Sequence, residues 1–426
     1  MLQTYSKQIP LSSKFSEEKF RILYVCPLAH LEGHPCFAAI SETESLVASG
    51  QEVTLLTFAG LLSGSVAKGV RHITVLEPSD TKSRRLIELN SRSLSAGIFV
   101  SIAFFLTLLK AMSVKRGADY DVIQLRDGTG LFASFPQILG IFFTGNSWLI
   151  SLLDTEDRSS FLGGLLKLTK LPFFYHKSLM RNRYAYACQN HYLYDYYSRT
   201  FLNGILDGKI HILPPVVSKT RKVAKQLSMS DAKSHFGISP NQNVLLSFGA
   251  LHAGKDLGTI LRALVGLENV TLLHAGRTNT RLLTSFNELK REYASPKFRY
   301  HDDYIDEESK ATYFAAASAL ILSYVKEFDA TSSMLWEACR FRVPVIASDN
   351  RQLSELVSKY DVGLTFCSQN SDSLRQTVMK FLSLSPDRVA EMRRNCDKFC
   401  EDFSSESWAR TCIQIYSHLR DDAIMR

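Results

Sequence analysis

The sequence has no block of like charges and no RNA-binding signature, although its overall balance is basic. Among 426 residues, 50 are lysine or arginine and 42 are aspartate or glutamate, which gives a formal net charge of +8. A mild excess of this kind suits anionic partners such as diphosphates, acidic lipid surfaces or nucleic acid. Because no stretch concentrates the positive charge, the composition argues against nucleic acid as the partner.

Cysteine is sparse, and its pattern excludes the usual metal motifs. The chain has 8 cysteines, no C-x-x-C pair, and no histidine joined to them at ligand spacing, so we expect no metal site. Cys396 and Cys400 lie four residues apart on a predicted helix, and the others are mostly in apolar or helical contexts. This usage indicates reduced thiols in a cytosolic protein.

The N-terminus lacks the apolar core of a secretory signal. Residues 1–20 read MLQTYSKQIPLSSKFSEEKF, which we expect to be a lead-in segment rather than a signal peptide. Internal repeats and low-complexity tracts are also missing from the sequence. The length suffices for two domains, and 45% hydrophobic with 22% charged residues is typical of a soluble globular protein.

A polar and basic stretch between residues 218 and 238 is poor in strand signals, and its beginning is the expected interdomain linker. We therefore predict an N-terminal domain over residues 1–217 and a second domain over residues 218–403. An amphipathic helix is expected in residues 404–426. Strands that alternate with helices along both halves indicate an α/β fold.

The first half opens with a strand, a glycine-bearing loop, a helix and a second strand. RILYVC at residues 21–26 and QEVTLLTF at residues 51–58 are the two strands of this βαβ unit. Gly33 in the loop permits close approach of the backbone to a ligand. His34 beside it could donate to an acceptor or a phosphate, or could be an exposed histidine at the start of a helix.

Two later segments of the first half raise the question of a membrane. Residues 94–112 are apolar over about the length of a span, which fits a buried crossover helix, contact with a membrane surface, or a true span. The segment 158–183 mixes six cations with leucine and phenylalanine. It could lie on anionic lipid or form a two-helix lid with a solvated basic face.

A buried strand at residues 120–125, YDVIQL, is followed by Arg126 and Asp127. Ligands of open α/β sheets bind at the carboxyl ends of the strands. Asp127 could therefore orient an acceptor hydroxyl, or it could cap the next helix.

The second half contains two blocks with the pattern strand, loop and helix. NVLLSF at residues 243–248 precedes a glycine-bearing loop that includes Gly249 and Lys255, and VTLLHA at 270–275 precedes Gly276 and Arg277. A lysine in such a loop favours a diphosphate electrostatically.

The most informative stretch runs from the strand ALILS at residues 319–323 to the strand VPVIAS at residues 343–348. Between them lies a helix whose N-terminus is preceded by Asp329, an expected N-cap, with further candidates at residues 331–333. Free amides and the positive end of the helix dipole gather there, which suits a phosphate. Glu337, about two turns into the helix, could accept hydrogen bonds from ligand hydroxyls.

This stretch resembles the signature of the GT-B glycosyltransferases, in particular the large retaining family that uses nucleotide sugars (group 1, family 4-like). That family has an acidic residue, seven residues and a glutamate, which here are Asp329 and Glu337, followed by a Pro-Val strand. Glu327 could serve in place of Asp329. The chain departs from the pattern at Asp329, at Val343 where the family has glycine, and at Ala250 where the family has arginine.

The resemblance implies two facing Rossmann-like domains, with the last helix crossing back onto the first domain. It implies a donor site made by the residues Gly33, Gly249, Lys255, Arg277, Glu327, Asp329, Ala330, Thr331, Ser332, Ser333 and Glu337. His34 and Asp127 would lie on the acceptor side. The residues expected to act in catalysis are Asp127, Lys255, Asp329 and Glu337.

The activity that the resemblance implies is transfer of a sugar from a nucleotide-diphosphate sugar to an acceptor hydroxyl with retention, in the synthesis of a cell-envelope polysaccharide or glycolipid. No metal and no cofactor beyond the nucleotide-sugar co-substrate is expected. The expected partners are the nucleotide sugar, a glycan or lipid-linked acceptor, and an anionic membrane surface, with the protein cytoplasmic or peripheral on the inner face of the plasma membrane. A nucleotide-sugar epimerase of the same fold and a non-catalytic binding protein are the alternatives.

Overall fold

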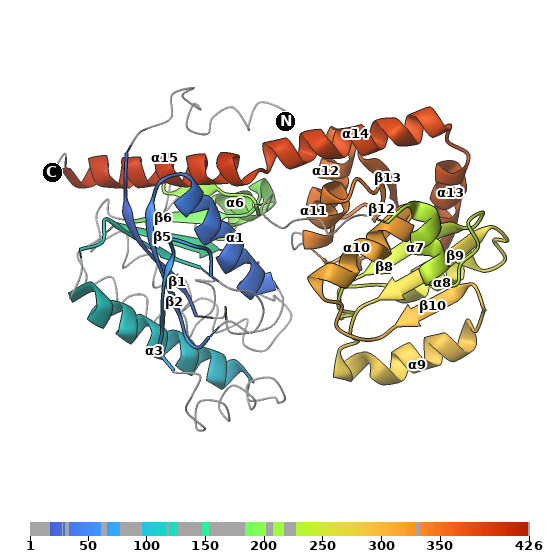
Figure 1. The fold of residues 1–426 in the computed structure, drawn as a ribbon, viewed down its shortest axis with the longest axis horizontal. Helices are drawn as coiled ribbons and strands as arrows, with labels where there is room; N and C mark the ends of the chain where they lie inside the picture. The colour runs from blue at the N-terminus through green and yellow to red at the C-terminus, as the bar shows by residue number, and fades with distance from the viewer. Residues whose placement is uncertain are drawn as a thin grey trace. The chain divides into compact units, whose positions relative to one another are not determined.

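The computed structural model divides the chain into two compact units. One comprises residues 1–218 together with 404–426, and the other comprises residues 219–403. The structure describes residues 18–27, 29, 34–60, 66–76, 96–116, 119–126, 147–152, 184–201, 208–216, 227–328 and 332–424, and Figure 1 draws their fold. Each unit is considered by itself below.

A parallel sheet forms the centre of the first unit, with the described strands in the order β3-β2-β1-β4-β5-β6-β7. The strands are β1 (Arg21–Cys26), β2 (Glu52–Thr57), β3 (Arg71–Thr74), β4 (Val122–Leu125), β5 (Ser147–Leu152), β6 (Tyr184–Cys188) and β7 (Ile210–Ile212). Their sequences are nearly continuous apolar runs because both faces of a parallel sheet are covered.

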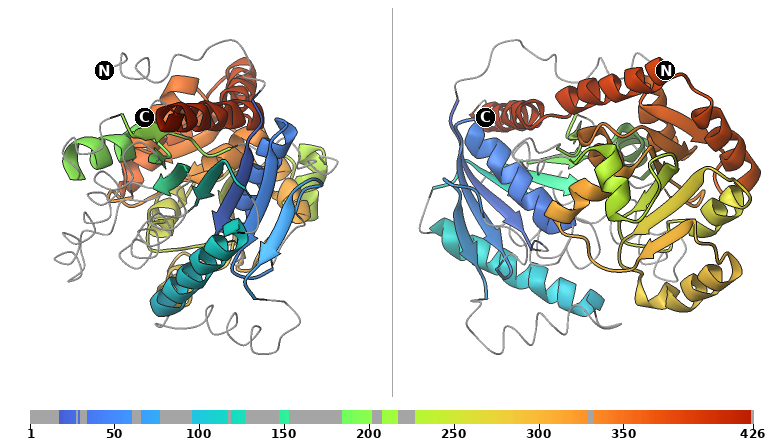
Figure 2. Two further views of the ribbon diagram at one scale, coloured as in Figure 1. Left: turned by 90° about the vertical axis from the view of Figure 1, so that its left-hand side faces the viewer. Right: turned by 45° about the vertical axis from the view of Figure 1, so that its right-hand side comes forward.

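Helices cover both faces of this sheet, as Figures 1 and 2 show. The described helices are α1 (His34–Ala48), α3 (Ala96–Arg116), α6 (His191–Asp195), the π-helix η3 (Tyr196–Phe201) and α15 (Ser405–Ile424). The two-residue period of β1 explains the two layers. Ile22 and Tyr24 face the core shared with α1 and α15, whereas Leu23 and Val25 face the core shared with α3 and α6.

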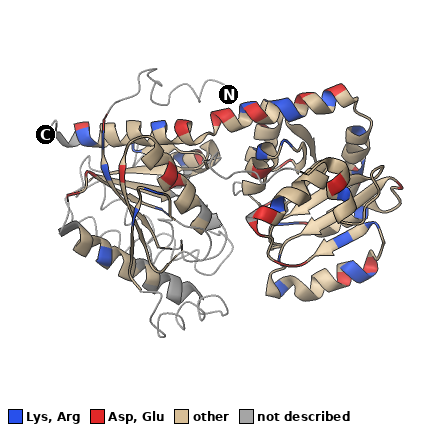
Figure 3. Ribbon diagram, in the orientation of Figure 1, with Lys and Arg blue, Asp and Glu red and all other residues tan. Residues whose placement is uncertain are grey.

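The apolar segment of the first half forms α3, which packs on the sheet through one face. Ala103 and Leu108 are buried, whereas Phe105 is 41% exposed and Leu109 is 44% exposed. Figure 3 shows no acidic residue on this helix. In the described part of the chain, no helix combines the length and the hydropathy that a membrane span requires. The segment is thus a crossover helix whose outer face exposes two large apolar side chains.

The C-terminal helix α15 belongs to the core of the first unit, although it follows the second unit in sequence. Trp408 and Cys412 are buried in that core. The Tyr416 hydroxyl donates to Oε1 of Gln124 on β4. These contacts anchor the end of the chain to the first sheet.

The second unit is also built on a parallel sheet, in the order β10-β9-β8-β11-β12-β13. Its described strands are β8 (Asn243–Phe248), β9 (Val270–Ala275), β10 (Phe298–His301), β11 (Ala319–Leu322), β12 (Val345–Ser348) and β13 (Gly363–Phe366). The described helices are α7 (Met229–His235), α8 (Leu257–Leu264), η4 (Thr280–Leu282), α9 (Leu283–Glu292), α10 (Glu307–Ala316), α11 (Ser333–Arg340), α12 (Arg351–Tyr360), α13 (Ser371–Leu382) and α14 (Pro386–Asp402).

The order of strands places a topological switch point in each sheet. In the second unit β8 pairs with both β9 and β11, so the chain leaves β8 toward one edge and later returns to its other side. In the first unit β1 has the same relation to β2 and β4. The loops that follow β8 and β11 are therefore the expected ligand-binding loops of the second unit.

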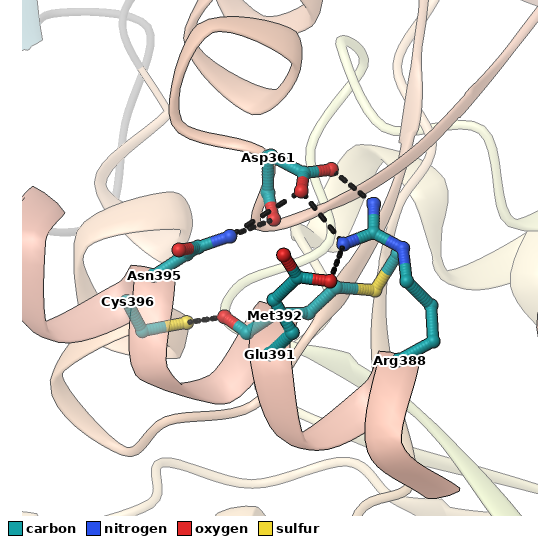
Figure 4. Close-up of polar contacts among 6 residues, drawn as sticks. All are labelled: Asp361, Arg388, Glu391, Met392, Asn395 and Cys396. Atoms are coloured by element: carbon teal, nitrogen blue, oxygen red, sulfur yellow. Dashed lines mark hydrogen bonds and ion pairs between the residues drawn. The ribbon is translucent and has the colours of Figure 1, made fainter. Parts of the chain in front are cut away.

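A polar link ties α12 to α14 behind these loops (Figure 4). Asp361 ends α12 in a left-handed conformation, with φ of 52°. Arg388 donates to both of its carboxylate oxygens, at 2.7 and 2.5 Å, and Nδ2 of Asn395 donates to its carbonyl at 3.1 Å. The link stabilises a helix end at which the residue in the left-handed conformation is aspartate rather than glycine.

Candidate functional site

The two loops at the switch point of the second unit are joined backbone to backbone. The amide of Val325 donates to the carbonyl of Gly254 at 3.0 Å, and the amide of Asp256 donates to the carbonyl of Ser323 at 3.0 Å. Lys255 and Tyr324 form an antiparallel bridge between these two bonds. The loop after β8 and the loop after β11 are thus one structural piece.

Aromatic packing reinforces this junction. The rings of Tyr324 and Phe328 are stacked, with centroids 4.1 Å apart and an interplanar angle of 8°. The Phe328 ring also lies against Gly254, where an added Cβ would come within 2.8 Å of it. A residue with a side chain at position 254 would push the two loops apart.

A second close approach joins the loop after β9 to the same site. Gly276 has φ of +145°, and a Cβ there would lie 2.3 Å from the carbonyl oxygen of Gly249. Gly249 has φ of +91°. Only glycine meets both requirements at position 276, namely the backbone angle and the absence of a side chain. The three loops after β8, β9 and β11 therefore meet at one edge of the sheet.

The ammonium group of Lys255 is turned inward at this junction. Its Nζ donates to the carbonyl of Phe248 at 2.6 Å, in a small pocket that is also lined by Ser323 and Tyr324. Burial lowers the pKa of Lys255 to about 7. The Ser323 hydroxyl in this pocket is buried and has no hydrogen-bond partner. The pocket thus holds the Lys255 amino group, which makes one hydrogen bond to Phe248, beside the Ser323 hydroxyl, which makes none.

The N-terminus of α11 lies next to Gly249 and Lys255. Met334, in the first turn, has its Sδ 3.5 Å from the place that a Cβ on Gly249 would occupy. The N-cap of α11 is Ser332, not the expected Asp329, and its side chain makes no cap bond. The Ser332 hydroxyl instead pairs with the Tyr324 hydroxyl at 2.7 Å. The first amides of α11 therefore receive no help from this side chain, and such amides attract anions.

Glu337 lies on α11 between two cations rather than in the Lys255 pocket. Its carboxylate is 3.6 Å from Nζ of Lys310 and 3.6 Å from Nε of Arg340. The Glu337 side chain is 16% exposed. The two cations hold the carboxylate in place. Its expected role toward ligand hydroxyls stays a prediction.

The loops after β9 and β10 present a surface ion pair. Arg277 lies 3.7 Å from Asp303, and both side chains are largely exposed. The Asp302 carboxylate accepts from the amide of Thr278 at 2.7 Å. Asp302 thereby fixes the turn that carries Arg277, so the geometry leaves Arg277 at the rim of the same edge.

Several predicted site residues lie outside the described residues, namely Gly33, Asp127, Asp329, Ala330 and Thr331. His34 begins α1, but its side chain is not described. Glu327 is exposed in the turn before them, and Ser333 is the first helical residue of α11 rather than part of the loop. Of the donor-side predictions, the structure brings Gly249, Lys255, Ser332 and Ser333 together.

A buried polar cluster lies at the switch point of the first unit, and no role was predicted for it from the sequence. Arg126, at the end of β4, pairs with Glu42 on α1. Glu42 also accepts a hydrogen bond from Tyr24, and burial followed by the negative charge of Glu42 raises the pKa of Tyr24 well above its ordinary value. The available signal was the polar run Ser-Glu-Thr-Glu-Ser at residues 41–45, which lies between apolar residues of this helix.

Comparison with known families adds a match over much of the second unit. Residues 229–401 match the model of the family described as Glycosyl transferases group 1. The matched range contains all three loops of the site. The resemblance read from the sequence is confirmed for this part of the chain. Comparison by sequence with curated proteins found no significant match.

Solved structures extend the likeness to nearly the whole chain. Sucrose-phosphate synthase from Thermosynechococcus elongatus superposes with a TM-score of 0.71 at 17% identity, over 94% of this chain and 99% of that one. The fold is GT-B. The catalytic domain of starch synthase IV from Arabidopsis thaliana, bound to ADP and acarbose, gives 0.72 at 12% identity over 95% and 100%. HepE from Anabaena, in complex with UDP and glucose, gives 0.63 at 13% over 93% and 99%.

The contact between Gly276 and Gly249 in this GT-B chain leads to a stability prediction. Replacement of Gly276 by alanine should lower the free energy of unfolding by about 2–4 kcal/mol, because the new methyl group overlaps a carbonyl and the backbone angle is unfavourable. Thermal and denaturant unfolding of the purified protein measure the effect.

Gly266→Ala is the matched control for this prediction. Gly266 also has a positive φ, of +75°, but its nearest neighbour to an added Cβ is 4.0 Å away. Its replacement should cost only the backbone strain, about 1 kcal/mol. Equal losses for the two variants would show that the approach of the two loops is not tight.

Proposed function

We propose that this GT-B protein transfers a sugar from a nucleotide-diphosphate sugar to an acceptor hydroxyl, with retention of the anomeric configuration. The observation that carries the proposal is that the Lys255 side chain and the first turn of α11 both lie beside Gly249 at the switch point of the second unit. Nζ of Lys255 and Sδ of Met334 are 3.1 and 3.5 Å from the position of a Cβ on Gly249. The ammonium and the helix N-terminus both favour a diphosphate. The family match covers these residues, and the UDP and ADP bound in two similar structures support a nucleotide donor.

In the proposed reaction the bond between the anomeric carbon and the diphosphate oxygen breaks, and its electron pair leaves with the oxygen. The acceptor oxygen bonds to the anomeric carbon on the same face, and its proton passes to the departing phosphate oxygen. The products are the glycoside and the nucleoside diphosphate. Lys255 and the amides of α11 would stabilise the charge that develops on the leaving group.

The remaining roles are binding of the sugar and the ribose by the second unit and binding of the acceptor by the first. Asp329 or Glu327 would bind the sugar hydroxyls, and Glu337 would bind the ribose. The first unit would present the acceptor near Gly33, His34 and Asp127. We propose a glycan or lipid-linked acceptor of the cell envelope, and no step of the proposed reaction passes through a metal.

A donor screen tests the proposal. UDP- and ADP-linked sugars are incubated with the protein and a cell-envelope extract, and release of nucleoside diphosphate is measured. Release that depends on the extract identifies a transferase. Conversion of the donor without an acceptor identifies an epimerase, and binding without turnover identifies a binding protein; either result would overturn the proposal.

Protonation of Lys255 leads to a prediction about pH. Burial lowers the pKa of Lys255 to about 7, so at pH 8 the group is mostly the neutral amine in the free protein. A bound diphosphate should raise this pKa, and the amine should then take up a proton. Affinity for a nucleotide sugar should therefore fall by about tenfold per pH unit above 7. Calorimetry in buffers of different ionisation enthalpy should detect uptake of about one proton per site.

Lys255→Met should remove both the proton uptake and most of the affinity. Lys398→Met, which removes the same charge from an exposed position on α14, serves as the control and should bind as the wild type does. If Lys255→Met keeps the pH-dependent affinity, another group titrates on binding and Lys255 does not hold the diphosphate.

The proposed contact of Glu337 with ribose can be measured separately. Glu337→Gln keeps the shape of the side chain but weakens its acceptor bonds, so the Kd for nucleotide sugars should rise by about tenfold. Glu288→Gln on the exposed side of α9 is the control. A donor with deoxyribose in place of ribose should bind the variant and the wild type with the same Kd. If removal of the ribose hydroxyl weakens binding to the variant as much as binding to the wild type, the assigned role is excluded.

We also propose contact with an anionic membrane surface through α3. Its outer face exposes Phe105 and Leu109, and residues 96–116 contain three basic and no acidic residues, so the helix joins apolar and cationic features. The wild type should float with vesicles that contain anionic lipid and not with neutral vesicles. The double variant Phe105→Ser, Leu109→Ser should lose flotation, and unchanged flotation would place the contact elsewhere.

A further inference from the structure

Asn350 occupies an unusual position at the carboxyl end of β12. It is the N-cap residue of α12, and asparagine is among the residues preferred there because its side chain accepts from the first helical amides. In this structure the Asn350 side chain makes no such cap bond. Because the side chain does not cap its own helix, we expect its hydrogen-bonding groups to have partners elsewhere.

The Asn350 amide reaches instead into the neighbouring loop after β11. Its Nδ2 donates to the carbonyl of Val325 at 2.8 Å and to the carbonyl of Phe328 at 3.1 Å. The carbonyl of Lys326 lies at 3.5 Å. Both hydrogens of the amide are thus used by the ends of one turn, which is closed by the bond from the amide of Phe328 to the carbonyl of Val325 at 3.0 Å.

The other end of the Asn350 side chain is also fixed. Its Oδ1 accepts from the hydroxyl of Ser348 at 2.5 Å, and the same hydroxyl oxygen accepts from the amide of Tyr324 at 3.1 Å. Ser348 is fully buried, and Asn350 is 7% exposed. Oδ1 also accepts from the hydroxyl of Ser368 at 3.3 Å, and the Ser348 hydroxyl has a second acceptor in the carbonyl of Leu322 at 3.1 Å. The donors of the Asn350 amide point toward the turn because the turn presents only carbonyl oxygens to it.

We propose that Asn350 is a positioning residue for the donor site. It holds the turn at residues 325–328, and this turn sets where the stacked ring of Phe328 lies against Tyr324 and Gly254. The proposal rests on the proposed function, because the loop and the first turn of α11 are the groups assigned to the donor. Asn350 itself touches no reacting atom in this account.

The chemistry requires an amide at this position. The partners in the turn are carbonyl oxygens, which need donors, whereas the hydroxyls of Ser348 and Ser368 donate to an acceptor at this place, and asparagine supplies both within one short side chain. Aspartate has nearly the same shape but would place a carboxylate oxygen against two carbonyls. Serine is too short to reach them.

The experiment compares Asn350→Asp and Asn350→Ser with a matched control, Asn370→Asp. Asn370 is the N-cap of α13, and its side chain accepts from the amide of Ser373 at 2.9 Å. Aspartate preserves that bond, so this variant should behave as the wild type does. Serine at position 350 keeps the test informative if a buried carboxylate prevents folding.

Two measurements are made on each variant of the full chain. Hydrogen exchange of the free protein should be at least about tenfold faster in peptides that cover residues 324–334, and unchanged in the sheet, because one or two hydrogen bonds are lost. The Kd and KM for UDP-glucose or ADP-glucose should rise by about tenfold while kcat changes little.

The outcomes separate this inference from the proposed function. Unchanged exchange in residues 324–334 overturns the inference, and so does faster exchange with unchanged affinity. Faster exchange spread over the whole second unit would show a general structural role and also overturns it. Failure of the wild type to bind any nucleotide sugar refutes the proposed function, whereas the exchange measurement then still decides whether Asn350 fixes the loop.

Discussion

The proposed donor site depends on the pairing of two loops across the switch point of the second sheet. Two backbone hydrogen bonds, Val325 to Gly254 and Asp256 to Ser323, bring the loop after β8 and the loop after β11 into one piece. Lys255 lies between these bonds, so its backbone position is fixed by the pairing of the two loops. Without this pairing, the cation and the N-terminus of α11 would have no fixed relation, and neither alone makes a diphosphate site.

The close approach of the loops at this junction explains why both glycines and aromatic residues surround it. Gly249, Gly254 and Gly276 permit approaches that a methyl group would prevent, and Phe328 fills the space beside Gly254. Buried polar groups then fix the loop from behind, through Asn350 and Ser348. The cost of holding Lys255 in this setting appears in its pKa, which burial lowers to about 7. A site that stores an ammonium in a dry position interacts strongly with an incoming anion, because little water has to be displaced.

Much of this organisation could be predicted from the sequence. Apolar runs of four to six residues marked the strands. The stretch from ALILS to VPVIAS predicted β11, α11 and β12, and it resembles the family whose model matches residues 229–401. Local rules failed where tertiary contacts prevailed. The N-cap of α11 is Ser332 instead of Asp329, and the sequence could not show that Asn350 would turn from its own helix to another loop. Likewise, nothing local to Glu42 and Arg126 reveals that they pair 84 residues apart.

The central claim is that a diphosphate binds between the Lys255 ammonium and the first amides of α11. A crystal structure of the protein with a bound nucleoside diphosphate tests this claim most directly. The account predicts that Nζ of Lys255 leaves the carbonyl of Phe248 and lies within hydrogen-bond distance of a phosphate oxygen, which also accepts from an amide of the first turn of α11. A diphosphate bound elsewhere, with Lys255 still on Phe248, would contradict it.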